Sequence, residues 1–258
     1  MSQSTETAPI LEAAEDRTVI RVSGTEAREF LQGMVTNDLA RLGAGAVYTA
    51  FLSPQGKYLA DFLMIADGDD VLLDVATPLA ASVVKRLGMF KLRADVTLEL
   101  TDMPVARGRG VAPPTAVEER RGPGLGGRVY GTAGGPATTD WDALRVALMV
   151  PEPGTELRPD DSYILEMGFE RLHGVDFKKG CYVGQEVTAR MKHKTALRIG
   201  LARVQIEGTA EPGTEITANG KPAGILGTQS GDRALAYLRF DRATGEMQAG
   251  SARVSWTP

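Results

Sequence analysis

The sequence predicts an α+β protein of two α+β parts with a small β-barrel at the C-terminal end. Three observations lead to this fold class: strands alternate with helices in the first part of the chain, glycine, proline and arginine dominate residues 105–136, and short strands separated by turns follow further on. We therefore expect an N-terminal α+β part over 1–104, a second α+β part over 105–194 and a barrel over 195–258.

The N-terminal part is predicted to consist of antiparallel strands with interposed helices. Thr18 to Val22 alternates as a strand does, and Ser23 to Glu26 offers a capping box, a serine followed three residues later by a glutamate. The helix that begins there is expected to bury Phe30, Leu31 and Met34. The remaining predicted elements are the strands Val47 to Leu52, Tyr58 to Ala66 and Val71 to Val75, a helix from its cap Thr77 to Met89, and the strand Val96 to Leu100.

The middle part has weaker patterns. We expect loops with short strands such as Arg128 to Tyr130 where hydrophobic periodicity fades. Trp141 to Val150 is predicted to be a strand that begins with an aromatic residue. A helix capped at Asp161 or the next residue is expected to end at His173.

The C-terminal part predicts the barrel. Leu197 to Ile206 alternates, and Asn219-Gly220 is a strong hairpin signal because both residues tolerate a positive φ. Ala234 to Leu238 and Ala252 to Trp256 are further short strands. Short strands with turns at this spacing are typical of a small β-barrel.

Composition narrows the class of protein. The 258 residues are 43% hydrophobic and 24% charged, which is typical of a globular protein, and no window approaches the length of a membrane-spanning helix. The net charge of −4 argues against general nucleic-acid binding. Met1 to Glu15 has three glutamates and no basic residue, so we expect a short disordered lead rather than a targeting peptide. A single cysteine forms no internal disulfide, and we expect a cytoplasmic location.

The only cysteine, Cys181, lies in Lys179-Gly180-Cys181-Tyr182-Val183-Gly184-Gln185-Glu186. A helix is expected from Gln185 to His193, because Val187 and Met191 are four residues apart. A thiol beside lysines and just before a helix N-terminus is favoured as the reactive thiolate. The alternative is a buried cysteine in a strand-to-helix turn with two solvated lysines.

The charge balance reverses in the same region, where cations face only Glu186. These cations are Lys178, Lys179, Arg190, Lys192, Lys194 and Arg198. A basic patch on an acidic protein suits a small anionic ligand such as the carboxylates of a folate, and a solvated helix face is the alternative.

The string from Lys179 to Glu186 resembles, without a mismatch, the signature K-G-C-[FY]-[TV]-G-Q-E of the YgfZ family, folate-binding proteins related to the aminomethyltransferase (T-protein) of the glycine cleavage system. Val22 to Asp38 is similar, more loosely, to the N-terminal pattern of that family. The resemblance implies an aminomethyltransferase-like folate-binding fold and a tetrahydrofolate-dependent role in assembling or repairing iron-sulfur clusters. It also implies that Cys181 and Lys179 are the catalytic residues.

The resemblance further implies a folate site. Trp141 resembles a family tryptophan whose indole can lie against a pterin or benzoyl ring, with a core tryptophan as the alternative. Asp61 lies where the aminomethyltransferases have paired aspartates, but Ala60 replaces one of the pair, which argues against one-carbon transfer; an outward-facing aspartate is the alternative. Arg145 suits a bidentate clamp on a carboxylate. The predicted cofactor-binding residues are Trp141, Asp61, Arg145, Tyr182, Gln185 and Glu186.

Three functions follow in order of preference. The first is a tetrahydrofolate-binding accessory protein for iron-sulfur clusters, whose partners are folate and iron-sulfur proteins or their assembly machinery. The second is a folate-dependent aminomethyltransferase or demethylase, and the third is a binding module in which the motif only shapes a turn. We expect no metal site, because one cysteine and two histidines fall short of about four ligands, and no nucleic-acid or membrane partner.

Overall fold

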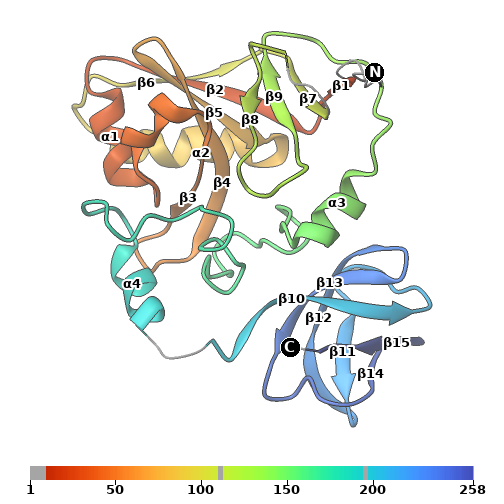
Figure 1. Ribbon diagram of the computed structural model, residues 1–258. Coiled ribbons are helices and arrows are strands. Elements are labelled where there is room, and N and C mark those ends of the chain that lie inside the picture. Colours follow the sequence, from red (N-terminus) through yellow and green to blue (C-terminus); the bar gives the residue numbers. More distant parts are fainter. Residues whose placement is uncertain (1–9, 110–112, 194–196, 258) are drawn as a thin grey trace, which may run out of the picture. The chain divides into compact units, whose positions relative to one another are not determined.

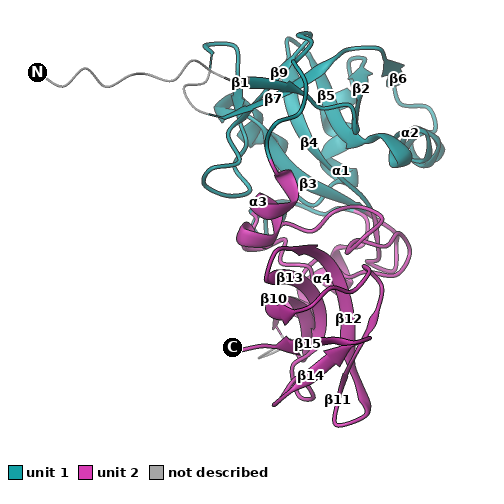
Figure 2. Cartoon of the chain, turned by 90° about the vertical axis from the view of Figure 1, so that its right-hand side faces the viewer, with its two compact units in different colours: residues 1–51, 60–139, 173–182 teal, residues 52–59, 140–172, 183–258 magenta. Residues whose placement is uncertain are grey.

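The computed structural model describes residues 10–109, 113–193 and 197–257 (Figure 1). The chain forms two compact units (Figure 2). Unit 1 comprises residues 1–51, 60–139 and 173–182, and unit 2 comprises residues 52–59, 140–172 and 183–258. Each unit is formed by segments that are distant in the sequence. The predicted division into 1–104, 105–194 and 195–258 follows the chain in order instead, and it stays a prediction.

The larger sheet has five strands in the order β3-β4-β5-β2-β6. Its strands are β2 (Arg17–Ser23), β3 (Val47–Leu52), β4 (Tyr58–Asp67), β5 (Asp70–Ala76) and β6 (Thr97–Thr101). Two helices contact this sheet, α1 (Ala27–Met34) and α2 (Thr77–Phe90). Every strand and helix predicted in this part is confirmed. The strands β3, β4 and β5 are almost entirely buried, and their apolar sequences made them recognisable.

The predicted capping box of α1 is wrong. The N-cap residue is Glu26, and no side chain caps the helix. The reason is tertiary: Glu26 accepts a hydrogen bond from the backbone N–H of Asp95, and Thr25 donates to the Asp95 carboxylate. Of the three side chains predicted to be buried on α1, Leu31 is buried, and the other two are half-buried. The N-cap of α2 is likewise Ala76, one residue before the predicted cap.

A second sheet of unit 1 has four antiparallel strands in the order β1-β7-β9-β8. Its strands are β1 (Ile10–Ala13), β7 (Val105–Arg109), β8 (Val117–Glu118) and β9 (Gly127–Tyr130). The prediction of a disordered lead is wrong from residue 10 onward, and residues 1–9 lie outside the described part. Hydrophobic periodicity missed most of this sheet because charged side chains on or next to its strands, Glu12, Glu119 and Arg128, are buried.

Two predictions in the middle of the chain are wrong. Trp141–Leu148 is the helix α3, not a strand, because Asp140 caps it by accepting a hydrogen bond from the N–H of Ala143. Residues 161–173 form a series of turns rather than a helix, since Gly168 and His173 have φ of +79° and +57°. Apolar spacing alone does not separate these alternatives.

The predicted helix after the cysteine is confirmed as α4 (Gln185–His193), whose one fully buried residue is Thr188. The predicted barrel is also confirmed as a closed barrel in the order β10-β13-β12-β11-β14-β15. Its strands are β10 (Ile199–Glu207), β11 (Glu215–Ala218), β12 (Lys221–Ser230), β13 (Arg233–Arg239), β14 (Met247–Ala249) and β15 (Ala252–Ser255). Asn219 and Gly220 make the expected turn with φ of +51° and +70°. Over the described ranges, the longest apolar stretch of any helix falls short of a membrane crossing.

Candidate functional site

The residues predicted to carry function divide between the two units. Unit 1 holds Asp61, Lys179, Cys181 and Tyr182, and unit 2 holds Trp141, Arg145, Gln185 and Glu186. Within unit 1 the structure brings the cysteine motif onto the segment that follows α1. We call residues 173–181 the cysteine loop.

Lys179 is the anchor of the cysteine loop. Its side chain is buried, and its Nζ donates hydrogen bonds to the backbone oxygens of Gln32 at 2.8 Å, Val35 at 2.6 Å and Asn37 at 3.0 Å. An ammonium group has three N–H donors, so all three are used. The acceptors lie in the last turn of α1 and just after it, where helix carbonyls lack intrahelical partners and a positive charge is favoured.

The environment of Lys179 has opposing electrostatic effects. Burial lowers the pKa of Lys179 to about 8, while the carboxylates of Asp38 and Asp176 raise it. The Nζ also lies 5.1 Å from the ring centre of Tyr182, within cation–π range. Tyr182 is buried, as expected of a packed neighbour of the anchor. Lys179 therefore holds the cysteine loop against the C-terminal end of α1.

Further hydrogen bonds fasten the start of the cysteine loop to the same segment. Thr36 Oγ1 donates to the backbone oxygen of Gly174 at 2.7 Å, and Asn37 Nδ2 donates to that of His173 at 2.6 Å. The N–H of Asp176 donates to the oxygen of Thr36 at 3.0 Å. The sequence resemblance covered Thr36 and Asn37 without assigning them a role. The short polar run Thr36-Asn37-Asp38 is the signal that could have identified them.

Asp176 connects the cysteine loop internally, through Lys178, and to the rest of unit 1, through Arg41. Its carboxylate accepts hydrogen bonds from the N–H of Lys178 at 2.8 Å and from Arg41 Nη2 at 2.6 Å. Burial raises the pKa of Asp176, but these hydrogen bonds and the Arg41 charge outweigh it and lower that pKa from its ordinary value. The loop is thus fixed at both ends before the cysteine.

Cys181 itself is exposed, two residues after the anchor. The prediction that it lies just before a helix N-terminus is correct only loosely, because α4 begins four residues later at Gln185 and the turn at Gly184 has a φ of +85°. An exposed thiol on a fixed loop is accessible for reaction as a nucleophile, for redox chemistry or for binding a metal. No group of three or more His, Cys, Asp or Glu side chains suited to a metal ion occurs among the described residues.

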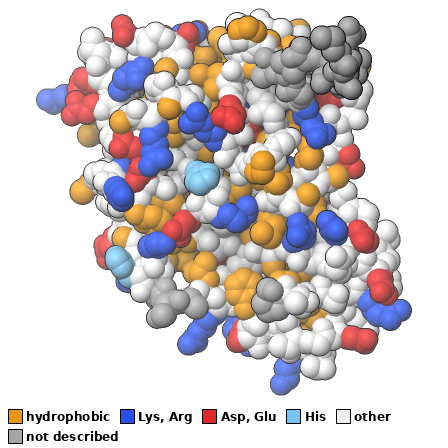
Figure 3. All heavy atoms as spheres, in the orientation of Figure 1, with side chains coloured by type: hydrophobic (Ala, Val, Ile, Leu, Met, Phe, Trp, Pro, Cys, Tyr) orange, Lys and Arg blue, Asp and Glu red, His pale blue; other side chains and the backbone are white. Residues whose placement is uncertain are grey.

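The predicted basic patch is smaller than the sequence suggested. Lys179 is buried, Lys192 pairs with Glu170, and Lys194 lies outside the described residues. On the face drawn in Figure 3, basic and acidic side chains are interspersed. Lys178 and Arg190 are exposed, the former in unit 1 and the latter in unit 2.

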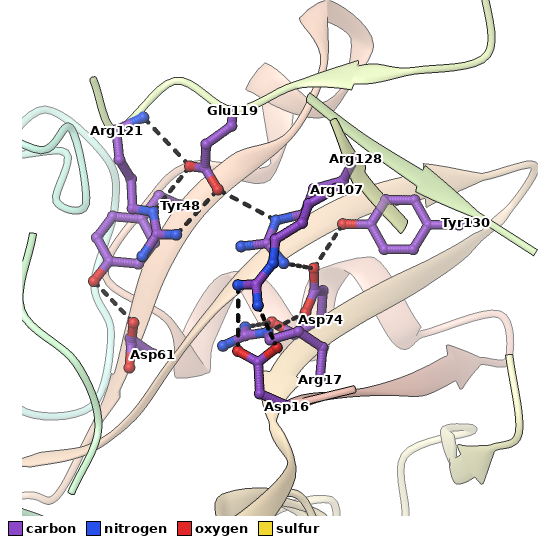
Figure 4. Close-up of polar contacts among 10 residues, drawn as sticks. All are labelled: Asp16, Arg17, Tyr48, Asp61, Asp74, Arg107, Glu119, Arg121, Arg128 and Tyr130. Carbon is purple, nitrogen blue, oxygen red and sulfur yellow. Dashed lines mark hydrogen bonds and ion pairs between the residues drawn. The ribbon is translucent and has the colours of Figure 1, made fainter. Parts of the chain in front are cut away.

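Asp61 ends a chain of buried polar groups in unit 1 (Figure 4). It is 2% exposed, and its Oδ2 accepts a hydrogen bond from the hydroxyl of Tyr48 at 2.9 Å. The guanidinium of Arg121 lies 5.0 Å from the Tyr48 ring. Arg121 in turn pairs with Glu119 at 2.9 Å. The alternative of an outward-facing aspartate at position 61 is therefore wrong, while its role toward folate stays a prediction.

The chain of ion pairs continues into both sheets of unit 1. Arg128 bridges Glu119 at 3.3 Å and Asp74 at 3.0 Å, and Asp74 also pairs with Arg17 at 2.6 Å (Figure 4). Burial raises the pKa of Glu119, but Arg121 and Arg128 outweigh it and lower that pKa to about 2. The pKa of Asp74 is lowered against its burial by Arg128 and Arg17. Paired in this way, the buried charges join the two sheets.

This network predicts acid sensitivity. The ordinary pKa of Glu119 is 4.5 and its folded value is about 2, so the stabilisation is present above 4.5 and is lost as the pH falls toward 2. We expect Glu119→Gln to make the loss of folded unit 1 between pH 4.5 and 2 less steep, as measured by hydrogen exchange of β8 and β9. Glu118→Gln, a change at the exposed neighbouring residue, is the control and is expected to keep the wild-type profile. An unchanged slope in Glu119→Gln contradicts the prediction.

In unit 2, Trp141 and Arg145 lie on α3. The indole of Trp141 is half-buried. Arg145 is engaged by protein groups: its Nη2 donates to Asp142 at 2.7 Å and to Thr228 Oγ1 at 3.0 Å, and Glu156 lies 3.5 Å from its Nη1. A folate carboxylate would have to compete with these partners. Gln185 and Glu186 form the first turn of α4, the latter exposed.

The fit of a folate to unit 2 is incomplete. A cavity of about 80 Å³ lies between residues 155–167 and the barrel strands β12 and β13, below the roughly 300–1,000 Å³ of small-molecule sites. Its carboxylate Glu156 already accepts hydrogen bonds from the N–H and hydroxyl of Thr228. Arg145, the predicted carboxylate clamp, is likewise engaged by protein groups.

Comparison with known proteins places this geometry in context. A protein-family model described as "CAF17, C-terminal beta-barrel domain" matches residues 198–258. The mitochondrial iron-sulfur cluster assembly factor IBA57 of Mus musculus is 30% identical over 280 residues, covering 90% of this chain and 78% of the relative. The human protein of the same name is 28% identical with the same coverage. The homologue from Mycosarcoma maydis is 34% identical over 70% of this chain, which spans 53% of that relative.

Among solved structures, the glycine cleavage system aminomethyltransferase T from Bartonella henselae is similar, with a TM-score of 0.77 at 12% identity over 95% of this chain and 84% of the other. This likeness confirms the predicted aminomethyltransferase-like fold and, at such low identity, the fold alone. The expected cytoplasmic location is contradicted, because these relatives are named as mitochondrial proteins. A single cysteine, on which that expectation was based, is equally compatible with any reducing compartment.

Proposed function

Because the chain belongs to the family of the IBA57 iron-sulfur cluster assembly factors, we propose that it acts in iron-sulfur cluster assembly through the thiol of Cys181. The observation that supports this role is the cysteine loop. Lys179 and Asp176 fix the backbone before the thiol, and the thiol remains exposed. Such a loop presents its thiol to a partner at little cost in conformational entropy.

The ligand count indicates how the thiol works. Protein-bound iron-sulfur clusters take about four thiolate or comparable ligands, and this chain has one cysteine. The other ligands therefore come from a partner protein or from the cluster's recipient. Iron-sulfur proteins or their assembly machinery are the proposed partners, and the cluster is cargo rather than a resident cofactor.

The test is removal and restoration of the protein in cells. We expect activities of iron-sulfur enzymes to fall when the protein is depleted and to return with the wild-type chain, while an enzyme without a cluster is unaffected. Equal activities of both enzyme classes with and without the protein would overturn the proposal.

Folate binding is a separate proposal, supported by the resemblance of the cysteine motif to the YgfZ family. We expect tetrahydrofolate binding by calorimetry to weaken by roughly fivefold in Trp141→Ala, since stacking on a bound ring contributes about 1 kcal/mol. Trp256→Ala is the matched control, because that indole stacks on Phe240 with ring centres 5.1 Å apart. Undetectable binding to the wild-type chain would remove folate from the proposed function and leave the role of Cys181 standing. The aminomethyltransferase alternative has only the fold in its favour.

A further inference from the structure

The C-terminal end of α2 in unit 1 exposes large apolar side chains. Met89 is 61% exposed, Phe90 36% and Leu92 86%. Phe90 also packs edge-on against the buried Phe51, with ring centres 6.2 Å apart. Exposed apolar side chains that gather within a few residues are typical of interaction sites.

Leu92 combines two unfavourable features. Its φ is +47°, in the left-handed region that bulky residues rarely adopt. This conformation directs the chain from α2 into the turn before β6 while the leucine side chain remains almost wholly in solvent. Leu92 directly follows the C-cap Lys91, where helices often end with a left-handed residue, usually glycine or asparagine, so an exposed leucine is an unusual choice there.

The charged side chains of this segment are basic, and the acidic Asp95 that follows the segment interacts with Lys91. The segment Lys85 to Arg93 contains four cations and no acidic residue in a chain of net charge −4. Lys85 and Arg93 are exposed, and no hydrogen bond or ion pair engages their side chains in the described part of the chain. We call Lys85, Met89, Phe90, Leu92 and Arg93 the α2 tip.

The rest of α2 does not share this exposure. Its apolar face, formed by Ala80, Val83 and Leu87, is buried. Helices that lie on a membrane surface present a continuous apolar face along their length, and here that face is used within unit 1. The small apolar area of the tip with cations beside it fits a pocket on a protein better than a lipid surface.

We propose that the α2 tip docks an acidic partner protein, which receives Leu92 in an apolar pocket whose rim carries carboxylates opposite Lys85 and Arg93. Desolvation of an apolar anchor supplies the affinity in such interfaces, and charges at the rim select the partner and speed its association. The α2 tip shares no residue with the cysteine loop, and both belong to unit 1.

The test begins with benzoylphenylalanine in place of Leu92, photo-crosslinked in cells, with Ala81, an exposed position earlier on α2, as the control site. We expect an adduct with an acidic protein from position 92 and none from position 81. The captured protein is then purified, and its binding to the full chain is measured by calorimetry. Leu92→Ser is expected to weaken that binding by roughly tenfold or more.

Charge reversal makes the test specific. The double variant Lys85→Glu with Arg93→Glu is expected to weaken binding and to remove most of its salt dependence, whereas Lys221→Glu, at an exposed barrel residue, leaves both unchanged. Thermal unfolding checks that each variant is folded. The proposal is overturned by the absence of an adduct at position 92, by an adduct with a second copy of this chain, or by equal Leu92-dependent binding to phosphatidylglycerol vesicles. Each of these measurements is independent of the role of Cys181.

Discussion

Replacing Cys181 by alanine is expected to abolish the restoration of iron-sulfur enzyme activity in depleted cells while leaving the fold intact. The thiol is exposed, and exposed substitutions change the free energy of unfolding by about 0.5 kcal/mol or less. A loss of activity therefore reports on chemistry and not on folding. The measurement is the activity of an iron-sulfur enzyme at matched levels of the wild-type and variant proteins.

Cys181→Ser sharpens this experiment, because serine keeps nearly the shape of the side chain but is a poor nucleophile and soft-metal ligand. We expect it to be as inactive as the alanine variant. Full activity of either variant would mean that the loop is only a structural turn, and the third function considered from the sequence would then be preferred.

Lys179→Met is expected to lower the free energy of unfolding of unit 1 by about 3 kcal/mol or more, since hydrogen bonds to a charged group contribute about 1.5–3 kcal/mol each. Methionine replaces the stem of the lysine but leaves the carbonyls of Gln32, Val35 and Asn37 without this donor. Lys178→Met is the matched control: the neighbouring lysine is exposed, and its loss is expected to change stability by about 0.5 kcal/mol or less.

The choice of probe matters for this experiment. Both tryptophans, Trp141 and Trp256, belong to unit 2, so their fluorescence does not report on α1. Hydrogen exchange of peptides from 27–37 and 173–182 does. We expect faster exchange in both peptides for Lys179→Met and wild-type exchange for Lys178→Met. Unchanged protection in Lys179→Met would show that the other hydrogen bonds suffice to hold the cysteine loop.

Cys181→Ala and Lys179→Met distinguish the chemical role of the thiol from the structural role of the lysine. Cys181→Ala is expected to remove function without loss of stability, and Lys179→Met to remove stability and, with it, the fixed presentation of the thiol. If Lys179→Met retained full stability but lost activity, the lysine would act in chemistry rather than as the anchor.

The sequence by itself determined the elements whose signals are local. Alternating apolar residues and the Asn219-Gly220 turn identified the barrel, apolar runs identified β3 to β5, and the spacing of Val187 and Met191 identified α4. These patterns suffice because strand alternation, turn conformation and helix periodicity depend on residues that are close in the chain. The cysteine motif was also identified from the sequence, because its residues are contiguous.

Tertiary structure alone decided how Lys179 anchors that motif and where the polar residues lie. Lys179 finds its acceptors at least 142 residues earlier in the chain, and Asp74, Glu119 and Arg128 are buried because each pairs with another across two sheets. Hydrophobic periodicity scores such residues as exposed, so it missed the anchor and most of the second sheet, of which it identified β9. A buried charge is tolerated only where its partners are already in place, and those partners are supplied by the fold, not by neighbours in the sequence.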